Sequence, residues 1–376
     1  MESDLTKRRP SIIPGSLPGL PLGWSPSIDT VEEDVSDEEN EVSKTYSSTS
    51  ISSLPSITNY EVKPYFTIKK FQYENPTSGQ TTTMSMAHTY GICTLNTEAE
   101  EIIACDHYNN RLIMFDSNTD GRALHIYRGD FPTPECVAPR PHHKQHIYVT
   151  KAHSVCLYDL EKKKIIQKLG AEESGHANNR FNLPRGITVD PTNGEIYMCD
   201  TWNHRICVFS SDFRFVNRRW YLTRWEQTQK KVKPSFVAIN ANNQCVVTCE
   251  DVPNYRGAVY VFDKMGYIQK IYDHDSRNKP PNAEAKLNVP HGILLDDDGN
   301  WLTVCYSDPE IRSVERRANI QNDEDNEIIN YWRCKELKGP SGLAMKRDQT
   351  LIIGDRDNNS LCFFKQREAS KTEATK

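Results

Sequence analysis

The sequence predicts an all-β fold, a six-bladed β-propeller that follows an N-terminal tail without regular structure. The first observation behind this prediction is a unit that recurs six times. Its equivalent residues Asp106 and Asp355 lie 249 positions apart over five intervals. The second observation is that each unit contains short β-rich runs separated by turn residues. A period of about 50 residues with three or four strands per unit is typical of propeller blades.

The third copy shows the plan of the unit most clearly. Its first β-rich run is Leu183–Asp190, its second is Glu195–Asp200 and its third is Ile206–Phe209. A tight turn containing Gly194 joins the first two runs, and a polar five-residue loop, residues 201–205, joins the second and third. This alternation of β-rich runs and turn residues predicts three consecutive short strands.

The remaining copies follow the same plan, the second and fourth with altered sequences. They begin, in chain order, at Thr89, Pro134, Pro234, Val289 and Gly339. The last copy has no fourth run before the charged C-terminal segment. A strand-like run, Tyr65–Phe71, precedes the first copy. We therefore expect this run to supply the outer strand of the last blade and to close the ring, which removes open sheet edges.

Composition divides the chain into three segments: residues 1–60, the propeller at 61–365, and a charged C-terminal tail at 366–376. The first segment carries ten acidic and four basic side chains, a net charge of −6, whereas the whole chain carries −5. Residues 61–376 are therefore close to neutral, at +1. An acidic segment rich in Ser and Pro cannot bury enough apolar surface to offset its ordering entropy, so the N-terminal tail is predicted to be disordered.

No targeting or membrane segment is predicted, and the cysteines are interpreted as core residues. Prolines at positions 10, 14, 18 and 21 interrupt any secretory apolar run. No segment approaches the roughly 20 apolar residues that span a bilayer. Cys245 and Cys249 would lie about 13 Å apart along one strand, which is too far for a metal pair. We expect a cytoplasmic protein with no membrane partner.

The repeat resembles the NHL repeat, named for an Asn-His-Leu-like turn whose place is taken here by Asn203-His204-Arg205. The resemblance covers roughly residues 65–365 and implies a six-bladed propeller. The chain is also similar to the C-terminal propellers of tripartite-motif NHL proteins, which recruit RNA or protein while separate RING and B-box modules transfer ubiquitin. The first 90 residues contain no Cys/His run of that spacing. The resemblance therefore implies an adaptor in ubiquitination or post-transcriptional regulation rather than a ligase.

The residue before the Gly-Ile position of each unit is expected to line the mouth of the central channel. Round the ring these residues are Tyr90, Glu135, Arg185, Ser235, His291 and Ser341. Metal-dependent propeller enzymes need three or four His, Asp, Glu or Asn ligands that converge on such a ring. Only Glu135 and His291 qualify, and Arg185 disfavours a cation, so no catalytic residue, metal or cofactor is predicted. The histidines at 142, 143 and 146 are assigned to a solvated turn on the opposite face.

The loops between the second and third runs are expected on the same face as the mouth. Two of them contain an Asp five residues before an Arg, which we interpret as structural salt bridges: Asp106/Arg111 and Asp200/Arg205. Tyr108 and Trp202 have no structural role in this pattern and are predicted to contact a partner. Arg356 lies in the corresponding loop of the sixth copy.

A segment that interleaves aromatic and basic residues, Arg218–Lys233, favours single-stranded RNA, because bases stack on aromatic rings while cations contact phosphates. In the alternative interpretation the aromatic residues pack in an outer strand and the charges form a solvated rim. The predicted partner-binding face comprises Tyr90, Tyr108, Arg185, Trp202, Arg224, Trp225, Lys230, Lys231, His291 and Arg356.

Two functions follow from these observations. The first is a monomeric, non-enzymatic recognition or scaffold module that binds a protein or single-stranded RNA on one propeller face. A protein partner is slightly favoured and DNA is not expected, because a near-neutral body with one basic patch offers few phosphate contacts. The second is a metal-dependent hydrolase or lyase of the six-bladed propeller type, because fold alone does not decide function.

Overall fold

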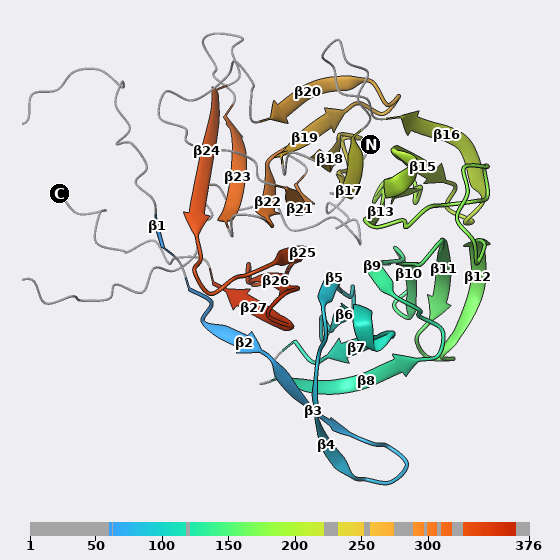
Figure 1. Cartoon of the computed structure of the whole chain (residues 1–376), viewed down its shortest axis with the longest axis vertical. Coiled ribbons are helices and arrows are strands. Elements are labelled where there is room, and N and C mark those ends of the chain that lie inside the picture. Colours follow the sequence, from blue (N-terminus) through green and yellow to red (C-terminus); the bar gives the residue numbers. More distant parts are fainter. Residues whose placement is uncertain are drawn as a thin grey trace, which may run out of the picture.

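The computed structural model describes residues 60–61, 63–117, 121–221, 232–251, 256–273, 289–296, 299–306, 310–317 and 326–365. These residues form β-strands and two short 3-10 helices. The strands assemble into six sheets, which are arranged round a common centre in Figure 1. The all-β propeller predicted from the repeats is thereby confirmed. The predicted tails, residues 1–59 and 366–376, lie outside the described residues.

Each sheet is one blade, and its first strand lies nearest the centre of the ring (Figure 1). Blade one contains β5 (Thr89–Thr94), β6 (Ile102–Asp106), β7 (Arg111–Phe115) and β8 (Arg122–Arg128). Blade two contains β9 (Pro134–Pro139), β10 (His146–Lys151), β11 (Ser154–Asp159) and β12 (Lys164–Gly170). Blade three contains β13 (Ile187–Val189), β14 (Ile196–Asp200), β15 (Arg205–Phe209) and β16 (Phe215–Tyr221). The 3-10 helices η1 (His107–Asn109) and η2 (Thr201–Asn203) follow β6 and β14.

The second half of the ring repeats this arrangement with one exception. Blade four contains β17 (Lys233–Ile239), β18 (Cys245–Asp251), β19 (Arg256–Phe262) and β20 (Ile268–Asp273). Blade five contains β21 (Pro290–Leu295), β22 (Trp301–Cys305), β23 (Glu310–Arg317) and β24 (Asn326–Arg333). Blade six contributes only β25 (Pro340–Met345), β26 (Leu351–Asp355) and β27 (Ser360–Phe364) from its own repeat. Its fourth strand comes from elsewhere in the chain.

The N-terminal part of the described chain closes the ring. Strand β2 (Phe66–Ile68) pairs antiparallel with β27 and completes blade six, as predicted for this part of Tyr65–Phe71. The prediction is wrong for the end of that run. Phe71 belongs to the next strand, β3 (Lys70–Glu74), which pairs in parallel with β8 at the edge of blade one and forms a projecting hairpin with β4 (Thr81–Ser85) (Figure 1). One chain segment therefore joins the last blade to the first.

A further short strand lies at the edge of blade five. Strand β1 (Tyr60–Glu61) pairs in parallel with β24, so Tyr60, the last residue of the predicted tail, belongs to a strand. Within the described part of the chain, no helix is long and apolar enough to cross a membrane.

Glycines set the close approach of the inner strands around the channel. A Cβ atom placed on Gly91 would lie 2.5 Å from Cys136 Cα of the next blade, and one on Gly186 would lie 2.5 Å from Phe236 Cα. Cβ atoms placed on Gly292 and Gly342 would likewise lie 2.4 and 2.5 Å from carbonyl oxygens of the next blade. Real Cβ atoms do not approach this closely, so only glycine at this position allows the inner strands of neighbouring blades to lie against one another. It thereby positions the residue before it at the channel mouth.

The core lies between neighbouring blades, where the middle strands are buried on both sides. Every residue of β6, β7, β14 and β15 is buried, which explains their continuous apolar runs. All eleven cysteines are buried and none of them forms a disulfide. Cys245 and Cys249 both lie in β18 within this core, as predicted.

Candidate functional site

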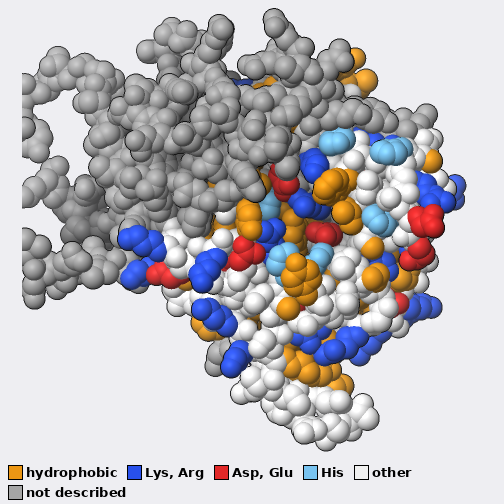
Figure 2. Space-filling model, viewed as in Figure 1, with side chains coloured by type: hydrophobic (Ala, Val, Ile, Leu, Met, Phe, Trp, Pro, Cys, Tyr) orange, Lys and Arg blue, Asp and Glu red, His pale blue; other side chains and the backbone are white. Residues whose placement is uncertain are grey.

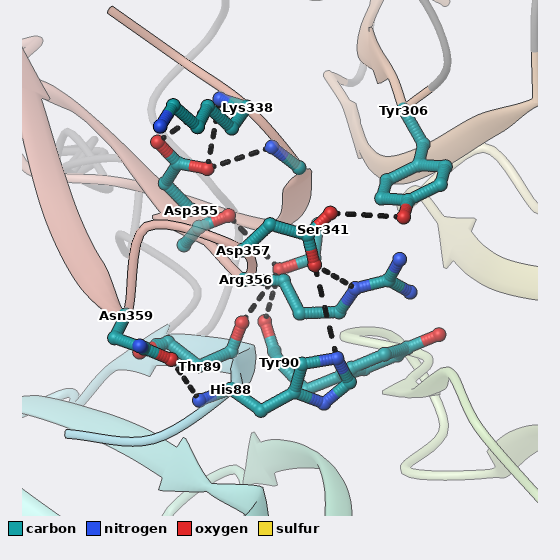
Figure 3. Close-up of polar contacts among 12 residues, drawn as sticks. His88, Thr89, Tyr90, Tyr306, Lys338, Ser341, Asp355, Arg356, Asp357 and Asn359 are labelled. Atoms are coloured by element: carbon teal, nitrogen blue, oxygen red, sulfur yellow. Dashed lines mark hydrogen bonds and ion pairs between the residues drawn. The ribbon is translucent and has the colours of Figure 1, made fainter.

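The first ring of residues at the channel mouth is the one predicted from the repeats. Tyr90, Glu135 and His291 are buried there, whereas Arg185 is partly exposed. The remaining two members, Ser235 and Ser341, are fully buried. Ser341 Oγ lies 2.9–3.0 Å from the carbonyl oxygens of Thr89, Tyr90 and Gly354, so this serine braces the backbone beneath the mouth (Figure 3).

A second ring comes from an equivalent position at the mouth end of the second strand of a blade. Near the start of the inner strand, equivalent residues pair with the second strand in blades one, four, five and six: Thr89↔Asp106, Pro234↔Cys249, Pro290↔Cys305 and Pro340↔Asp355. The next residues along the chain are His107, Glu250, Tyr306 and Arg356. The same backbone position in four blades therefore directs four chemically different side chains to one mouth. Figure 2 shows histidine, acidic, basic and apolar side chains gathered around the centre of this face.

Glu250 is the centre of one polar network at the mouth. Arg185 Nη1 donates to Glu250 Oε1, and His291 Nε2 lies 3.0 Å from the same oxygen. Burial alone would raise the pKa of Glu250, but the Arg185 charge and the His291 hydrogen bond hold that pKa well below its usual range. Burial lowers the pKa of His291, so its ring is neutral at pH 7. Because a carboxylate only accepts, Nε2 carries the proton and Nδ1 is an acceptor.

Arg356 is the centre of a second network, contributed by blades five and six (Figure 3). Its guanidinium carbon lies 3.9 Å from the centre of the Tyr306 ring, and its Nε donates to Asp357 Oδ1 at 3.1 Å. Tyr306 Oη donates to the other oxygen of Asp357 at 2.9 Å. Burial would raise the pKa of Asp357, but these two hydrogen bonds outweigh it and lower the pKa. The ring and the carboxylate together fix the guanidinium plane.

Tyr90 and Glu135 lie between the two networks. The guanidinium carbons of Arg185 and Arg356 are 5.7 and 5.9 Å from the centre of the Tyr90 ring. Glu135 Oε1 lies 3.6 Å from His107 Nδ1 of blade one. Burial raises the pKa of Glu135 to about 7, although both arginines oppose the shift. Burial also raises the pKa of Tyr90, whose hydroxyl therefore remains protonated.

Three buried polar atoms of the first-ring side chains have no hydrogen-bond partner among the described residues. They are Tyr90 Oη, Glu135 Oε2 and His291 Nδ1. An unsatisfied buried polar group costs about 1–3 kcal/mol. Three such atoms from blades one, two and five therefore indicate that water or a ligand completes this site.

The loops around the mouth contain both predicted salt bridges. Arg111 Nε donates to Asp106 Oδ2 at 2.6 Å, and Arg205 Nε donates to Asp200 Oδ2 at 2.7 Å. All four side chains are buried. The structural interpretation of both pairs is confirmed.

The rim of the mouth exposes the two predicted aromatic residues. Tyr108 is 66% exposed and stacks on His88, with ring centres 4.3 Å apart. Trp202 is 44% exposed, and Lys233 Nζ lies 3.2 Å from the centre of its ring. Both rings occupy the second position of a 3-10 helix, η1 or η2, so the repeat itself directs them outward.

The structure describes only part of the predicted basic segment. Four predicted partner-binding residues lie outside the described residues: Arg224, Trp225, Lys230 and Lys231. Trp220 is buried in β16 and packs on Tyr197 and Phe262, with ring centres 5.5 and 5.6 Å apart. The outer-strand interpretation is therefore correct for this residue, and its ring is unavailable for stacking on a base.

The opposite end of the channel differs in chemistry. A cavity of about 200 Å³ there is lined mainly by apolar residues of the inner strands, such as Ile92, Val137 and Leu343. His142 and His143 lie in the β9–β10 turn, as predicted, beside a separate hollow shared with blade three, whereas His146 is the first residue of β10 rather than part of the turn. Nowhere in the described part of the chain do three or more His, Cys, Asp or Glu side chains form a group that could hold a metal ion.

Sequence reasoning missed Glu250, Tyr306 and His107 as members of the mouth. The signal was the position directly after the aligned Asp106, Asp200 and Asp355, and His107 occupies this position in blade one. In blades four and five Cys249 and Cys305 replace the Asp, so the repeat pattern does not mark Glu250 and Tyr306.

Comparison with known proteins supports the repeat and the fold. The NHL repeat family model matches residues 181–209, which span the loop before β13 through β15. Protein brain tumor of Drosophila melanogaster is 22% identical over 161 residues, 43% of this chain and 14% of that protein. Peptidyl-glycine alpha-amidating monooxygenase of Mus musculus is 24% identical over 205 residues, 51% of this chain and 19% of that protein. The matches thus span less than a fifth of either relative.

Among solved structures, a chain of Kuenenia stuttgartiensis hydrazine synthase is similar with a TM-score of 0.52 and 14% identity. The likeness covers 75% of this chain and 97% of that chain. At this identity it shows the fold alone. The chain thus carries an NHL repeat within a β-propeller.

Proposed function

We propose that this chain is a non-enzymatic recognition module that binds a protein partner on the mouth face of its propeller. The observation that carries the proposal is the pair of exposed rings, Tyr108 and Trp202, which the repeat places at equivalent positions on one rim. Tyr, Trp and Arg are the residues most enriched at the energetic centres of protein interfaces. Arg185 and Arg356 lie in the mouth that this rim surrounds.

The described geometry favours protein over single-stranded RNA. A base needs an open aromatic face, whereas the amine of Lys233 already lies over the Trp202 ring. Trp220, the described tryptophan of the segment Arg218–Lys233, is buried. In ubiquitination or mRNA repression, a module of this kind would act as an adaptor that selects targets for other proteins.

The test compares two tyrosines of equal exposure on opposite faces. Tyr108 lies at the mouth rim and is 66% exposed, while Tyr267, in the β19–β20 turn, is 68% exposed. In quantitative affinity capture with cross-linking, we expect Tyr108→Ala combined with Trp202→Ala to lose specific partners that Tyr267→Ala retains. Equal capture of partners by the wild type, the double variant and Tyr267→Ala would overturn the proposal.

Two further measurements address the alternatives. Binding of a random single-stranded RNA pool that weakens steeply with salt, and that depends on Trp202, would replace the protein partner with RNA. Stoichiometric zinc or calcium in the purified protein would favour the metal-dependent hydrolase or lyase. For the proposed module we expect neither RNA binding nor bound metal.

A further inference from the structure

The mouth presents two arginines that do not use all of their hydrogen-bond donors in the described fold. A guanidinium has five N–H donors. Among the described contacts, Arg185 uses one terminal nitrogen toward Glu250, and Arg356 uses its Nε toward Asp357 and makes a further side-chain hydrogen bond with Tyr306. In Figure 3 the outer nitrogens of Arg356 point away from the contacts drawn, above the Tyr90 ring. Both guanidiniums are held in place and keep further N–H donors without a hydrogen-bond partner among the described residues, which is the arrangement of a preformed site rather than of a surface charge.

The unpaired buried atoms lie in the same place. Tyr90 Oη is a donor, since its hydroxyl stays protonated, and the Tyr90 ring lies beneath both guanidiniums. Glu135 Oε2 is buried and unpaired on the adjacent blade. Both side chains are more than nine-tenths buried, at 3% and 8% exposure. They are too enclosed for bulk solvent to satisfy them.

From this geometry we infer that the mouth binds a carboxylate group, held by the outer nitrogens of Arg185 and Arg356 and by Tyr90 Oη. The planar guanidinium matches the two oxygens of a carboxylate. The site stands on the mouth alone, so it goes beyond the proposed docking of a protein on the rim. The carboxylate belongs either to a small organic acid or to an acidic side chain of a partner.

A carboxylate fits this mouth better than a phosphate does. Glu250 and Asp357 are ionised there, and each already faces one of the arginines. With two guanidiniums and two carboxylates the fixed charges of the mouth cancel, so a second negative charge on the ligand gains no net attraction there, whereas a planar carboxylate still matches the guanidinium hydrogen-bond geometry. We therefore expect inorganic phosphate to bind more weakly than acetate.

Glu135 makes the binding depend on pH. It faces the following titratable or charged groups: Tyr90, Cys105, His107, Cys136, Arg185, Glu250 and Arg356. Its pKa is about 7, so below that pH the side chain is neutral and Oε2 can donate to a bound carboxylate. Above that pH the ionised Glu135 side chain repels a bound carboxylate. Carboxylate affinity is therefore expected to rise as the pH falls through 7.

The experiment uses the full chain and measures binding by calorimetry, with the melting temperature as a second readout at constant ionic strength. The probes are acetate and its neutral analogue acetamide, inorganic phosphate, and the capped peptide Ac-Ala-Glu-Ala-NH2 with its Gln counterpart. The variants are Arg185→Lys and Arg356→Lys, which keep the positive charge but lose the planar guanidinium group. Glu135→Gln tests the pH dependence, and Arg122→Lys, an exposed arginine, is the matched control.

We expect saturable binding of acetate, none of acetamide, and an affinity loss of about tenfold in Arg185→Lys and Arg356→Lys but not in Arg122→Lys. Glu135→Gln should instead remove the pH dependence of the affinity. Stronger binding of the Glu peptide than of acetate identifies a partner's side chain as the source, and the reverse identifies a small acid. Absence of binding by every carboxylate, or equal binding by acetamide, would show that water alone fills the mouth and would overturn the inference. The rim proposal is tested separately by Tyr108 and Trp202, so either can fail alone.

Discussion

Blades three and six have the same loop after their second strand but place an arginine differently in it. Both loops begin with a buried Asp, Asp200 or Asp355, and the Asn three residues later donates to that Asp. Both reach a left-handed residue at the next position, His204 or Asn359. In blade three the arginine comes directly after this residue, whereas in blade six it comes directly after the Asp.

This difference of position decides what the arginine does. Arg205 is 1% exposed and donates to Asp200 and to the carbonyl oxygens of His176, Ala177 and Arg180. Arg356 instead leaves the loop toward the channel mouth. In both blades the Asp also accepts from the backbone of the loop that enters the inner strand: Asp200 accepts from the N–H of Asn182, and Asp355 accepts from the N–H groups of residues 338 and 339. The turn geometry thus depends on the Asp and the Asn, and the arginine is available for another role.

The two blades also differ in how their sheets are completed, and the largest predicted effect tests this. Deleting residues 61–75 removes β2 from blade six and β3 from blade one, whereas blade three has all four of its own strands. Buried Ile68 and Phe71 are lost with them. We expect the melting temperature to fall by about 10 °C or more. Thr83→Ala, in exposed β4, is the control and should change stability by less than about 0.5 kcal/mol. An unchanged melting curve of the deletion would rule out closure by β2.

The next effect separates the two arginines. Arg205→Ala leaves the buried Asp200 carboxylate without its cation, so we expect a loss of about 3–5 kcal/mol in the free energy of unfolding. Arg356→Ala removes a partly exposed pair with Asp357 and should cost about 1 kcal/mol or less. Urea denaturation measures both. Equal losses would mean that Arg356 is also a structural brace.

The regular features of the repeat explain how much the sequence could predict. The 50-residue period located every blade, and the glycine after Tyr90, Arg185, His291 and Ser341 located the first ring, because strand register ties neighbouring positions together. The Asp-to-Arg spacing predicted both braces for the same reason. These features depend on local pattern alone.

The networks at the mouth could not be predicted because they join residues of different blades. Glu250 meets Arg185 and His291 only after three blades have packed together, and the Tyr306 contact with Arg356 requires two. Nor does the sequence show that Tyr90 is buried beneath both guanidiniums. The depth of a side chain in the mouth follows from how closely the glycines allow the blades to approach.

The smallest predicted effect is at Glu135 in blade two, whose pKa is influenced by Arg185 of blade three and by Arg356 of blade six. Because its folded pKa of about 7 exceeds its ordinary value of 4.5, the native state binds an extra proton between these pH values. The stability from this group is fully present below pH 4.5 and is lost as the pH rises through 7. The free energy of unfolding of Glu135→Gln should therefore rise by up to roughly 3 kcal/mol relative to that of the wild type between pH 4.5 and 8.

Arg185→Leu should raise the pKa of Glu135 more than Arg356→Leu does, because Arg185 opposes the burial effect more strongly. Carboxyl carbon NMR titration of the two variants measures this order, and the reverse order would make blade six the dominant charge at the mouth.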